Sequence, residues 1–232
     1  MTLQVHSIDT FYGTSHILHG VSLDVADGEL FAILGRNGTG KTTLLRSITG
    51  VSPPAHGSIV LNGTEIARLK SHRRVWLGIS YVPQGRDIIP DITVAENIHV
   101  ALIGKGQKAR KIPEFVFEYF PALKSLMDLK GGVLSGGQQQ QLAIARALVQ
   151  QPKLLLMDEP TEGLQPSVVE EIEPIIKRIP GERNCAVLLV EQNLDFVRAI
   201  TQRFAILDTG RIVSTGNISE LTPDVVHRHL AV

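Results

Sequence analysis

A glycine-rich octapeptide has the composition of a phosphate-binding loop. Residues 35–42 read Gly-Arg-Asn-Gly-Thr-Gly-Lys-Thr and fit the pattern G-x-x-x-x-G-K-S/T. Glycines let backbone N–H groups converge on an anion, and a helix that begins near Lys41 directs its positive end at the same point. We expect Lys41 to bind the β- and γ-phosphates of a nucleotide, and the Thr42 hydroxyl to ligate Mg²⁺. The other nucleotide-binding residues expected here are Asn37, Gly38, Thr39, Gly40 and Thr43.

Two adjacent carboxylates follow an apolar run in the second half of the chain. Residues 154–157 read Leu-Leu-Leu-Met, and Asp158 and Glu159 come next. A carboxylate at the end of a buried strand is costly unless it meets a cation or hydrogen bonds. Asp158 is therefore expected in the Mg²⁺ shell, and Glu159 is placed to polarise the attacking water. A simple acidic pair at a turn, favoured by Pro160, is the alternative, and the upstream phosphate-loop pattern disfavours it.

A second polar, glycine-rich segment reads Leu-Ser-Gly-Gly-Gln at residues 134–138. Ser135 and Gln138 fit a capping box for the helical pattern that follows. Capping does not require the two glycines, so the bare backbone of Gly136 and Gly137 predicts a second anion site at a helix N-terminus. Two anion sites so far apart in sequence either fold together or leave one of them to act on a neighbouring subunit's nucleotide.

Composition narrows the class of protein. The chain has 232 residues, of which 43% are hydrophobic and 20% charged, and its net charge of zero disfavours nucleic acid as a partner. The single cysteine, Cys185, excludes an internal disulfide, fits a reducing compartment and is expected to be a small buried hydrophobe. No run reaches the ~18 apolar residues of a membrane span, and no signal peptide is recognisable. We therefore expect a cytosolic protein whose link to a membrane is a partner.

Periodicity predicts sheet-forming flanks and a helical middle. Expected strands are residues 3–7, 21–25, 30–34, 59–61, 154–158, 186–191 and 204–208, and expected helices are residues 41–49, 114–126, 135–150 and 167–179. The nearly all-apolar strands of the second half indicate a parallel sheet buried on both faces.

Local signals refine these elements. Asp27-Gly28 predicts a hairpin between two early strands, and residues 208–210 begin a closing hairpin. Thr93 with Glu96 resembles a capping box, and Pro174 is expected to kink its helix.

The order of these motifs resembles that of the nucleotide-binding subunit of ATP-binding cassette transporters, over nearly the whole chain. Residues 134–138 match that family's signature. The resemblance implies a head-to-tail dimer with two ATP molecules, each lying between one subunit's phosphate loop and the other's Ser135, Gly137 and Gln138. It implies an α/β fold, with a P-loop NTPase sheet core, an N-terminal antiparallel β subdomain and an inserted helical lobe. We expect one domain, 1–232, with the core at 1–87 and 151–232 and the lobe at 88–150.

Two further positions match the family, and two depart from it. The resemblance implies that Tyr12 stacks on adenine, where the alternative is a half-buried strand aromatic, and that Gln84 reaches Mg²⁺ and links the two lobes. The family's usual Leu-Asp after the catalytic glutamate is Leu164-Gln165 here, and its usual histidine after the next strand is Gln192. A glutamine amide donates a hydrogen bond to phosphate but does not titrate near neutral pH. We therefore expect Glu159 and Gln192 to be the catalytic pair.

The finer resemblance leaves the transported solute open between two branches. Residues 190–193 (Val-Glu-Gln-Asn) and 82–86 (Val-Pro-Gln-Gly-Arg) look like importers of branched-chain amino acids, whereas residues 135–141 and 158–167 look more like the urea-importer subunit. We favour urea, with branched-chain amino acids as the alternative.

The expected partners are transmembrane permease subunits, a second identical or related ATPase subunit and, indirectly, a solute-binding protein, at the cytoplasmic face of the membrane. Two other classes of protein fit less well. A soluble cassette ATPase acting on ribosomes or DNA usually has fused cassettes, a coiled-coil insertion or basic extensions. A small-molecule kinase built on a phosphate loop would leave residues 134–138 unexplained.

Overall fold

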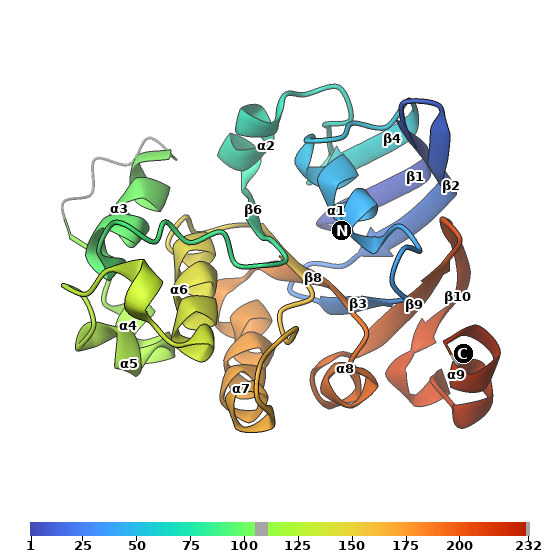
Figure 1. Ribbon diagram of the computed structural model, residues 1–232. Coiled ribbons are helices and arrows are strands. Elements are labelled where there is room, and N and C mark those ends of the chain that lie inside the picture. The colour runs from blue at the N-terminus through green and yellow to red at the C-terminus, as the bar shows by residue number, and fades with distance from the viewer. Residues whose placement is uncertain (105–110, 231–232) are drawn as a thin grey trace.

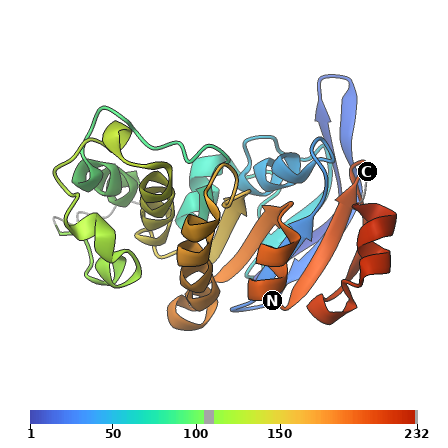
Figure 2. The ribbon, with the colours of Figure 1, turned by 60° about the horizontal axis from the view of Figure 1, so that its bottom comes forward.

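The computed structural model describes residues 1–104 and 111–230, so residues 105–110 of the expected lobe lie outside the described part. Two sheets and the helices around them make up the molecule (Figures 1 and 2). The strands are β1 (Leu3–Tyr12), β2 (Ser15–Val25), β3 (Leu30–Leu34), β4 (His56–Leu61), β5 (Thr64–Glu65), β6 (Ile79–Val82), β7 (Leu154–Asp158), β8 (Ala186–Glu191), β9 (Arg203–Asp208) and β10 (Arg211–Asn217). The α-helices are α1 (Lys41–Thr49), α2 (Ser71–Leu77), α3 (Val94–Gly104), α4 (Phe115–Tyr119), α5 (Pro121–Lys124), α6 (Gly136–Leu148), α7 (Pro166–Arg183), α8 (Leu194–Ile200) and α9 (Pro223–His229).

The larger sheet has the strand order β10-β9-β3-β8-β7-β6, and every pair except β9 with β10 is parallel. Parallel strands end at a common edge. The register places Leu34 opposite Glu191, and Asp158 opposite Val190, so β3, β7 and β8 end side by side. The loops that carry the expected phosphate, Mg²⁺ and catalytic residues therefore leave the sheet at one edge, as the rule for ligand sites in open α/β sheets requires.

Each face of the larger sheet belongs to a different hydrophobic core. Phe31 and Ile33 of β3 pack with α1 and with the smaller, antiparallel sheet, whose order is β2-β1-β4-β5. The alternate residues of β3, such as Ala32, pack with helices of the opposite face, among them α6, α7 and α8. Figure 1 shows α1 between the two sheets and α7 and α8 below the larger one. This two-sided burial explains the continuous apolar runs in the sequence.

The hairpin expected at Asp27-Gly28 is wrong. Gly28 does form a turn, with φ +64°, but β2 pairs antiparallel with β1, whereas β3 pairs parallel with β8 and β9 in the other sheet. β3 is buried at all five positions, while only three of the eleven positions of β2 are buried. A strand buried on both faces needs cover on both sides, and β3 has it in the centre of the larger sheet, between β8 and β9. The closing hairpin expected after residue 208 does form, between β9 and β10.

The helical middle follows its local signals with one exception. Thr93 and Glu96 form the expected capping box at the start of α3, and Ser135 caps α6. The single helix expected over residues 114–126 is wrong, because the chain forms two short helices, α4 and α5. Phe120 between them has φ −128° and ψ 69°. Pro121 pushes the residue before it away from helical geometry and lacks an N–H to continue the helix.

Other details differ from the expected pattern. β6 was not expected, because its four residues are too short a run to stand out beside α2. Pro174 and Pro180 lie inside α7 without interrupting it, and the kink at Pro174 stays a prediction. The boundaries expected at residues 87/88 and 150/151 also stay predictions. Cys185 is buried, as expected.

Candidate active site

The segment between β3 and α1 is a tight loop. At several of its positions only glycine readily fits the backbone conformation or the space. Gly38 and Gly40 have φ +81° and +106°, a backbone region that other residues rarely adopt. A Cβ on Gly35 would lie 2.5 Å from the carbonyl oxygen of Leu207, so the loop also runs close to the end of β9. α1 begins directly after the loop, at Lys41, and its N-terminus faces the space that the loop encloses.

Lys41 is buried within this loop. Its side chain is 4% exposed, and Nζ donates to the carbonyl oxygens of Gly35 at 2.8 Å and Arg36 at 3.0 Å. The ammonium also forms an ion pair with Glu159 Oε1 at 3.0 Å. The two expected functional groups, one from each loop, are thus in direct contact.

Asp158 ends β7 with its carboxylate beside the start of α1. Oδ1 accepts a hydrogen bond from the Thr42 hydroxyl at 3.1 Å, and Oδ2 accepts one from the Tyr81 hydroxyl at 2.9 Å. Burial raises the pKa of the Asp158 carboxyl, and the two hydrogen bonds oppose this rise without cancelling it. A hydroxyl and a buried carboxylate are oxygen ligands of the kind that Mg²⁺ takes, so the residues fit that ion.

Glu159 has an unusual backbone conformation and a fixed side chain. Its φ is +46°, which is uncommon for a residue with a side chain and clusters at functional sites. Its Oε2 accepts a hydrogen bond from Gln192 Nε2 at 3.0 Å, and the same amide nitrogen donates to Asn37 Oδ1 at 2.8 Å. Gln192 therefore joins the loop after β8 to both the phosphate loop and Glu159.

The phosphate loop, the start of α1 and Glu159 line one open hollow. Its lining residues are Tyr12, Ile17, Asn37, Gly38, Gly40, Lys41, Thr42, Thr43, Gln84 and Glu159. Tyr12, at the end of β1, is 42% exposed, and its hydroxyl accepts a hydrogen bond from Ser52 at 3.3 Å. Gln84 is exposed, and its Nε2 donates to Glu162 Oε2 at 2.9 Å. Thr39 is buried behind the loop, and its hydroxyl donates to the carbonyl oxygen of Arg36.

The expected second anion site does not line this hollow. Ser135 and Gln138 form a reciprocal capping box, in which Ser135 Oγ accepts from Gln138 N at 3.3 Å and Gln138 Oε1 accepts from Ser135 N at 3.0 Å. Capping does not require the glycines, but packing gives a local reason for Gly137. A Cβ there would lie 2.6 Å from Val168 Cγ1, so close packing against α7 already requires glycine.

The architecture and the site match one family. A family model for the ABC transporter matches residues 18–162, which is more than half of the chain. The chain belongs to the ABC transporter family. It binds ATP and hydrolyses it in a reaction coupled to transport. ATPase subunits of this family pair as dimers and work with permeases.

Similar proteins cover nearly all of this cassette. The high-affinity branched-chain amino acid transport ATP-binding protein BraG of Pseudomonas aeruginosa is 39% identical over 212 residues, which are 91% of each chain. The probable branched-chain amino acid transport ATP-binding protein LivF of Archaeoglobus fulgidus is 37% identical, over 94% of this chain and 93% of its own. A dimeric ATP-binding cassette solved after hydrolysis with ADP and Pi has a TM-score of 0.81 at 26% identity, over 93% of this chain and 98% of its own.

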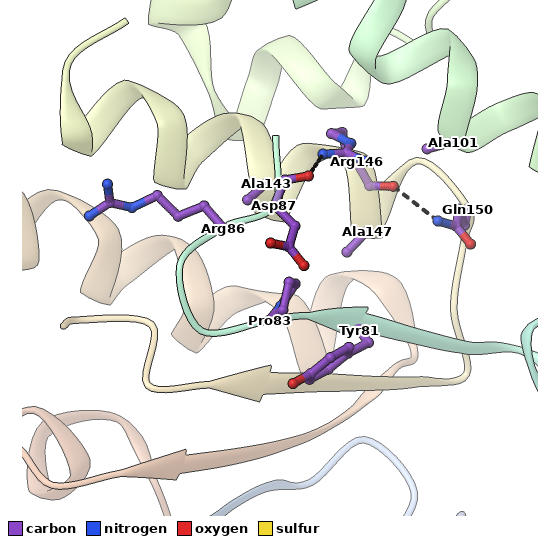
Figure 3. A pocket seen from close by; sticks show the side chains of 9 residues that line it. All are labelled: Tyr81, Pro83, Arg86, Asp87, Ala101, Ala143, Arg146, Ala147 and Gln150. Carbon is purple, nitrogen blue, oxygen red and sulfur yellow. Dashed lines mark hydrogen bonds between the residues drawn. The ribbon is translucent and has the colours of Figure 1, made fainter. Parts of the chain in front are cut away.

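A second hollow lies beside the loop that follows β6 (Figure 3). Arg86 and Asp87 in this loop have positive φ values of 74° and 46°. Two arginines fasten the loop to α6: Arg146 donates to the Asp87 carbonyl oxygen at 2.6 Å, and Arg86 donates to the side chains of Gln139 and Gln140. The loop after Gln84 is thus held against α6, the helix that begins within the family signature at residues 134–138.

Sequence reasoning missed two polar residues near the reaction centre. Tyr81 donates to Asp158 from β6, a strand that was not expected. Glu191 is 3% exposed and accepts hydrogen bonds from the loops after β7 and β8. The signal for Glu191 was present, because it ends an apolar run just as Asp158 does.

No helix among residues 1–104 and 111–230 is long and apolar enough to cross a membrane.

Proposed function

We propose that this cassette is the ATPase subunit of an importer of branched-chain amino acids. The observation that carries this proposal is the similarity to two branched-chain amino acid transport subunits, at 39% and 37% identity over more than nine-tenths of each chain. Urea, the solute favoured by the residues 135–141 and 158–167, has no support among these relatives. The motifs at 82–86 and 190–193 agree with the amino acid branch.

The geometry supports a role for each residue of the hollow. On ATP binding, Lys41 exchanges the carbonyl oxygens of its own loop for phosphate oxygens, while the N–H groups of the loop and of α1 hold the phosphates. Thr42 and Asp158 would hold Mg²⁺, which supplies neutralisation of the charge on the β- and γ-phosphates, and Gln84 would complete the shell. Tyr12 lies at the rim of the hollow, where an adenine ring would stack.

Glu159 and Gln192 are proposed to handle the attacking water. Glu159 loses its ion-pair partner when Lys41 turns to phosphate, so its carboxylate becomes available to accept a proton from water or to orient it. The two hydrogens of the Gln192 amide already bond Glu159 and Asn37. On ATP binding, one would turn from Asn37 to the γ-phosphate while the other keeps Glu159 aligned. Ser135, Gly137 and Gln138 would act on the nucleotide of the partner subunit.

The remaining partners follow from this role. Permease subunits would hold the cassette at the cytoplasmic face of the membrane as a peripheral subunit. A solute-binding protein would act through those permeases, and the second ATPase subunit is either a second copy or a related chain.

The test is a reconstituted transporter in vesicles. The cassette, its co-purified membrane subunits and the associated binding protein are assembled, and ATP hydrolysis is measured with leucine, isoleucine, valine or urea outside. We expect the branched-chain amino acids to stimulate hydrolysis and urea to have no effect, with Glu159→Gln as the inactive control. Stimulation by urea alone would contradict the proposal.

A further inference from the structure

Glu191 is a buried carboxylate that the proposed reaction does not use. It is 3% exposed at the end of β8, and it forms no ion pair within residues 1–104 and 111–230. Four hydrogen bonds satisfy it instead. Oε1 accepts from Thr161 N at 3.0 Å and from Thr161 Oγ1 at 2.7 Å. Oε2 accepts from Gln192 N at 2.8 Å and from Asn193 N at 3.1 Å.

The two oxygens of Glu191 therefore hold two different loops. One loop follows β7 and carries Glu159, two residues before Thr161. The other follows β8 and carries Gln192. The side chains of Glu159 and Gln192 meet at 3.0 Å in front of the phosphate loop. One carboxylate thus sets the spacing between the two backbones that present the proposed catalytic pair.

Only a carboxylate at this position satisfies both loops. Three of the four donors are backbone N–H groups, which cannot reverse their role, and an ionised carboxylate offers acceptors on both oxygens. An amide of the same shape has one oxygen and one NH₂, so in either orientation its NH₂ faces at least one backbone N–H. That N–H is then buried without an acceptor, which displaces its loop.

We propose that Glu191 is a positioning residue for ATP hydrolysis, which aligns Glu159 with Gln192 by clamping the loops after β7 and β8 together. The inference rests on the roles proposed above for Glu159 and Gln192. It assigns to Glu191 a task separate from nucleotide binding, because none of its hydrogen bonds reaches the phosphate loop. Loss of the clamp should slow the chemical step and spare ATP affinity.

The experiment compares Glu191→Gln with wild type in purified cassette. Hydrolysis at saturating Mg-ATP gives kcat, calorimetry gives the affinity for Mg-ATP, and thermal unfolding checks the fold. We expect kcat to fall ~10- to 100-fold, as a misplacement of about 1 Å does, while the affinity changes less than about threefold. Thr161→Val, which removes only the 2.7 Å hydroxyl bond, should give a smaller fall in kcat.

A matched control applies the same chemical change elsewhere. Glu65 Oε1 also accepts two backbone N–H groups, from Ile59 at 3.1 Å and Ala67 at 2.8 Å, but in the antiparallel sheet. Glu65→Gln should therefore keep the wild-type kcat.

Combining Glu191→Gln with Gln192→Ala should lower kcat by less than the product of the two single effects, because both act on one arrangement.

Three results would overturn the proposal. The first is a wild-type kcat in folded Glu191→Gln. The second is a loss of ATP affinity in that variant as large as its loss of kcat. The third is a fall in kcat of the double variant equal to the product of the falls caused by Glu191→Gln and Gln192→Ala. If Glu191→Gln does not fold, Thr161→Val decides the question, and an unchanged kcat there contradicts the clamp. Glu159→Gln is measured in parallel: full turnover in that variant contradicts the role proposed for Glu159 itself, whatever Glu191 does.

Discussion

Asp158, the carboxylate proposed to hold Mg²⁺, is buried at a cost to the fold. Its carboxylate is 1% exposed and has two hydroxyl donors, yet burial still raises its pKa. An ionised group whose pKa is higher in the folded state than in the unfolded state destabilises the fold at pH values above both pKa values. We therefore infer that the ionised Asp158 carboxylate destabilises the folded cassette, and that a bound cation offsets this effect.

Asp158→Asn should stabilise the isolated cassette in the absence of nucleotide and metal. At pH 7 we expect a gain on the order of 1 kcal/mol, because the neutral amide still bonds Thr42 and Tyr81 and avoids the buried charge. The gain should shrink as the pH falls through the raised pKa of folded Asp158 and vanish below the unfolded pKa of ~3.9, where wild-type Asp158 is protonated in both states. Thermal unfolding across this pH range measures the effect.

The matched control is Asp208→Asn, because Asp208 also ends a strand but is only half-buried. It should give no comparable gain. Mg-ATP should raise the unfolding temperature of wild type far more than that of Asp158→Asn, since only the wild type keeps the carboxylate proposed to hold Mg²⁺. Equal stability of wild type and Asp158→Asn at pH 7 would contradict the inference that ionised Asp158 destabilises the fold.

At the scale of elements, short-range patterns were predictable and long-range partners were not. The starts of α1, α3 and α6 follow from local capping and glycine signals, and all three match the structure. The partner of a strand is not a local property. The turn at Asp27-Gly28 suggested a hairpin, but β3 finds its neighbours in strands that lie far downstream, because burial on both faces decides its place.

The same distinction applies to the candidate site. Lys41, Asp158 and Glu159 were identified separately by type and spacing, and Gln192 through the family resemblance. A parallel sheet brings the four together because its strands end at one edge. Tyr81 could not be found in this way, and Glu191 had the signal of a carboxylate that ends an apolar run but nothing that showed its role. Their roles depend on the neighbour that each side chain meets, which is visible only once the strand order is known.

The start of α6 gives a prediction that separates two neighbouring glycines. A Cβ on Gly137 would lie 2.6 Å from Val168 Cγ1, and valine has little freedom to turn away. A Cβ on Gly136 would meet only the flexible guanidinium of Arg86, at 3.4 Å. Gly137→Ala should therefore lower the free energy of unfolding by about 1–3 kcal/mol, as overpacking does, and Gly136→Ala should not.

Chemical denaturation measures both variants, and Gly136→Ala is the control for the loss of a glycine in the first turn of α6. Adding Val168→Ala to Gly137→Ala should recover part of the lost stability relative to Val168→Ala alone, since it removes the methyl group that clashes. Equal stability of the two glycine variants would contradict the packing argument.

At the scale of the whole molecule, the two proposed parts of the nucleotide site lie apart in one chain. The hollow at the phosphate loop is lined by residues of β1, β2, the loops and the start of α1, and none of residues 134–138 lines it. Ser135 is exposed at the other lobe, on the N-terminus of α6. A similar cassette was solved as a dimer with ADP and Pi. An exposed half-site on each copy is what a two-fold dimer with composite sites requires.

Mixing two inactive variants should therefore restore hydrolysis. Lys41→Ala lacks the phosphate-binding ammonium but keeps Ser135, and Ser135→Arg blocks the second anion site but keeps Lys41. A dimer with one copy of each contains one complete site, made of Lys41 from one copy and Ser135 from the other. Phosphate release by an equal mixture should reach up to about a quarter of the wild-type rate, because random pairing makes half of the dimers mixed. Each variant alone should be inactive, and Ser135→Arg should still bind ATP as a monomer. Loss of ATP binding by monomeric Ser135→Arg would place Ser135 in the site of its own chain and contradict the composite dimer.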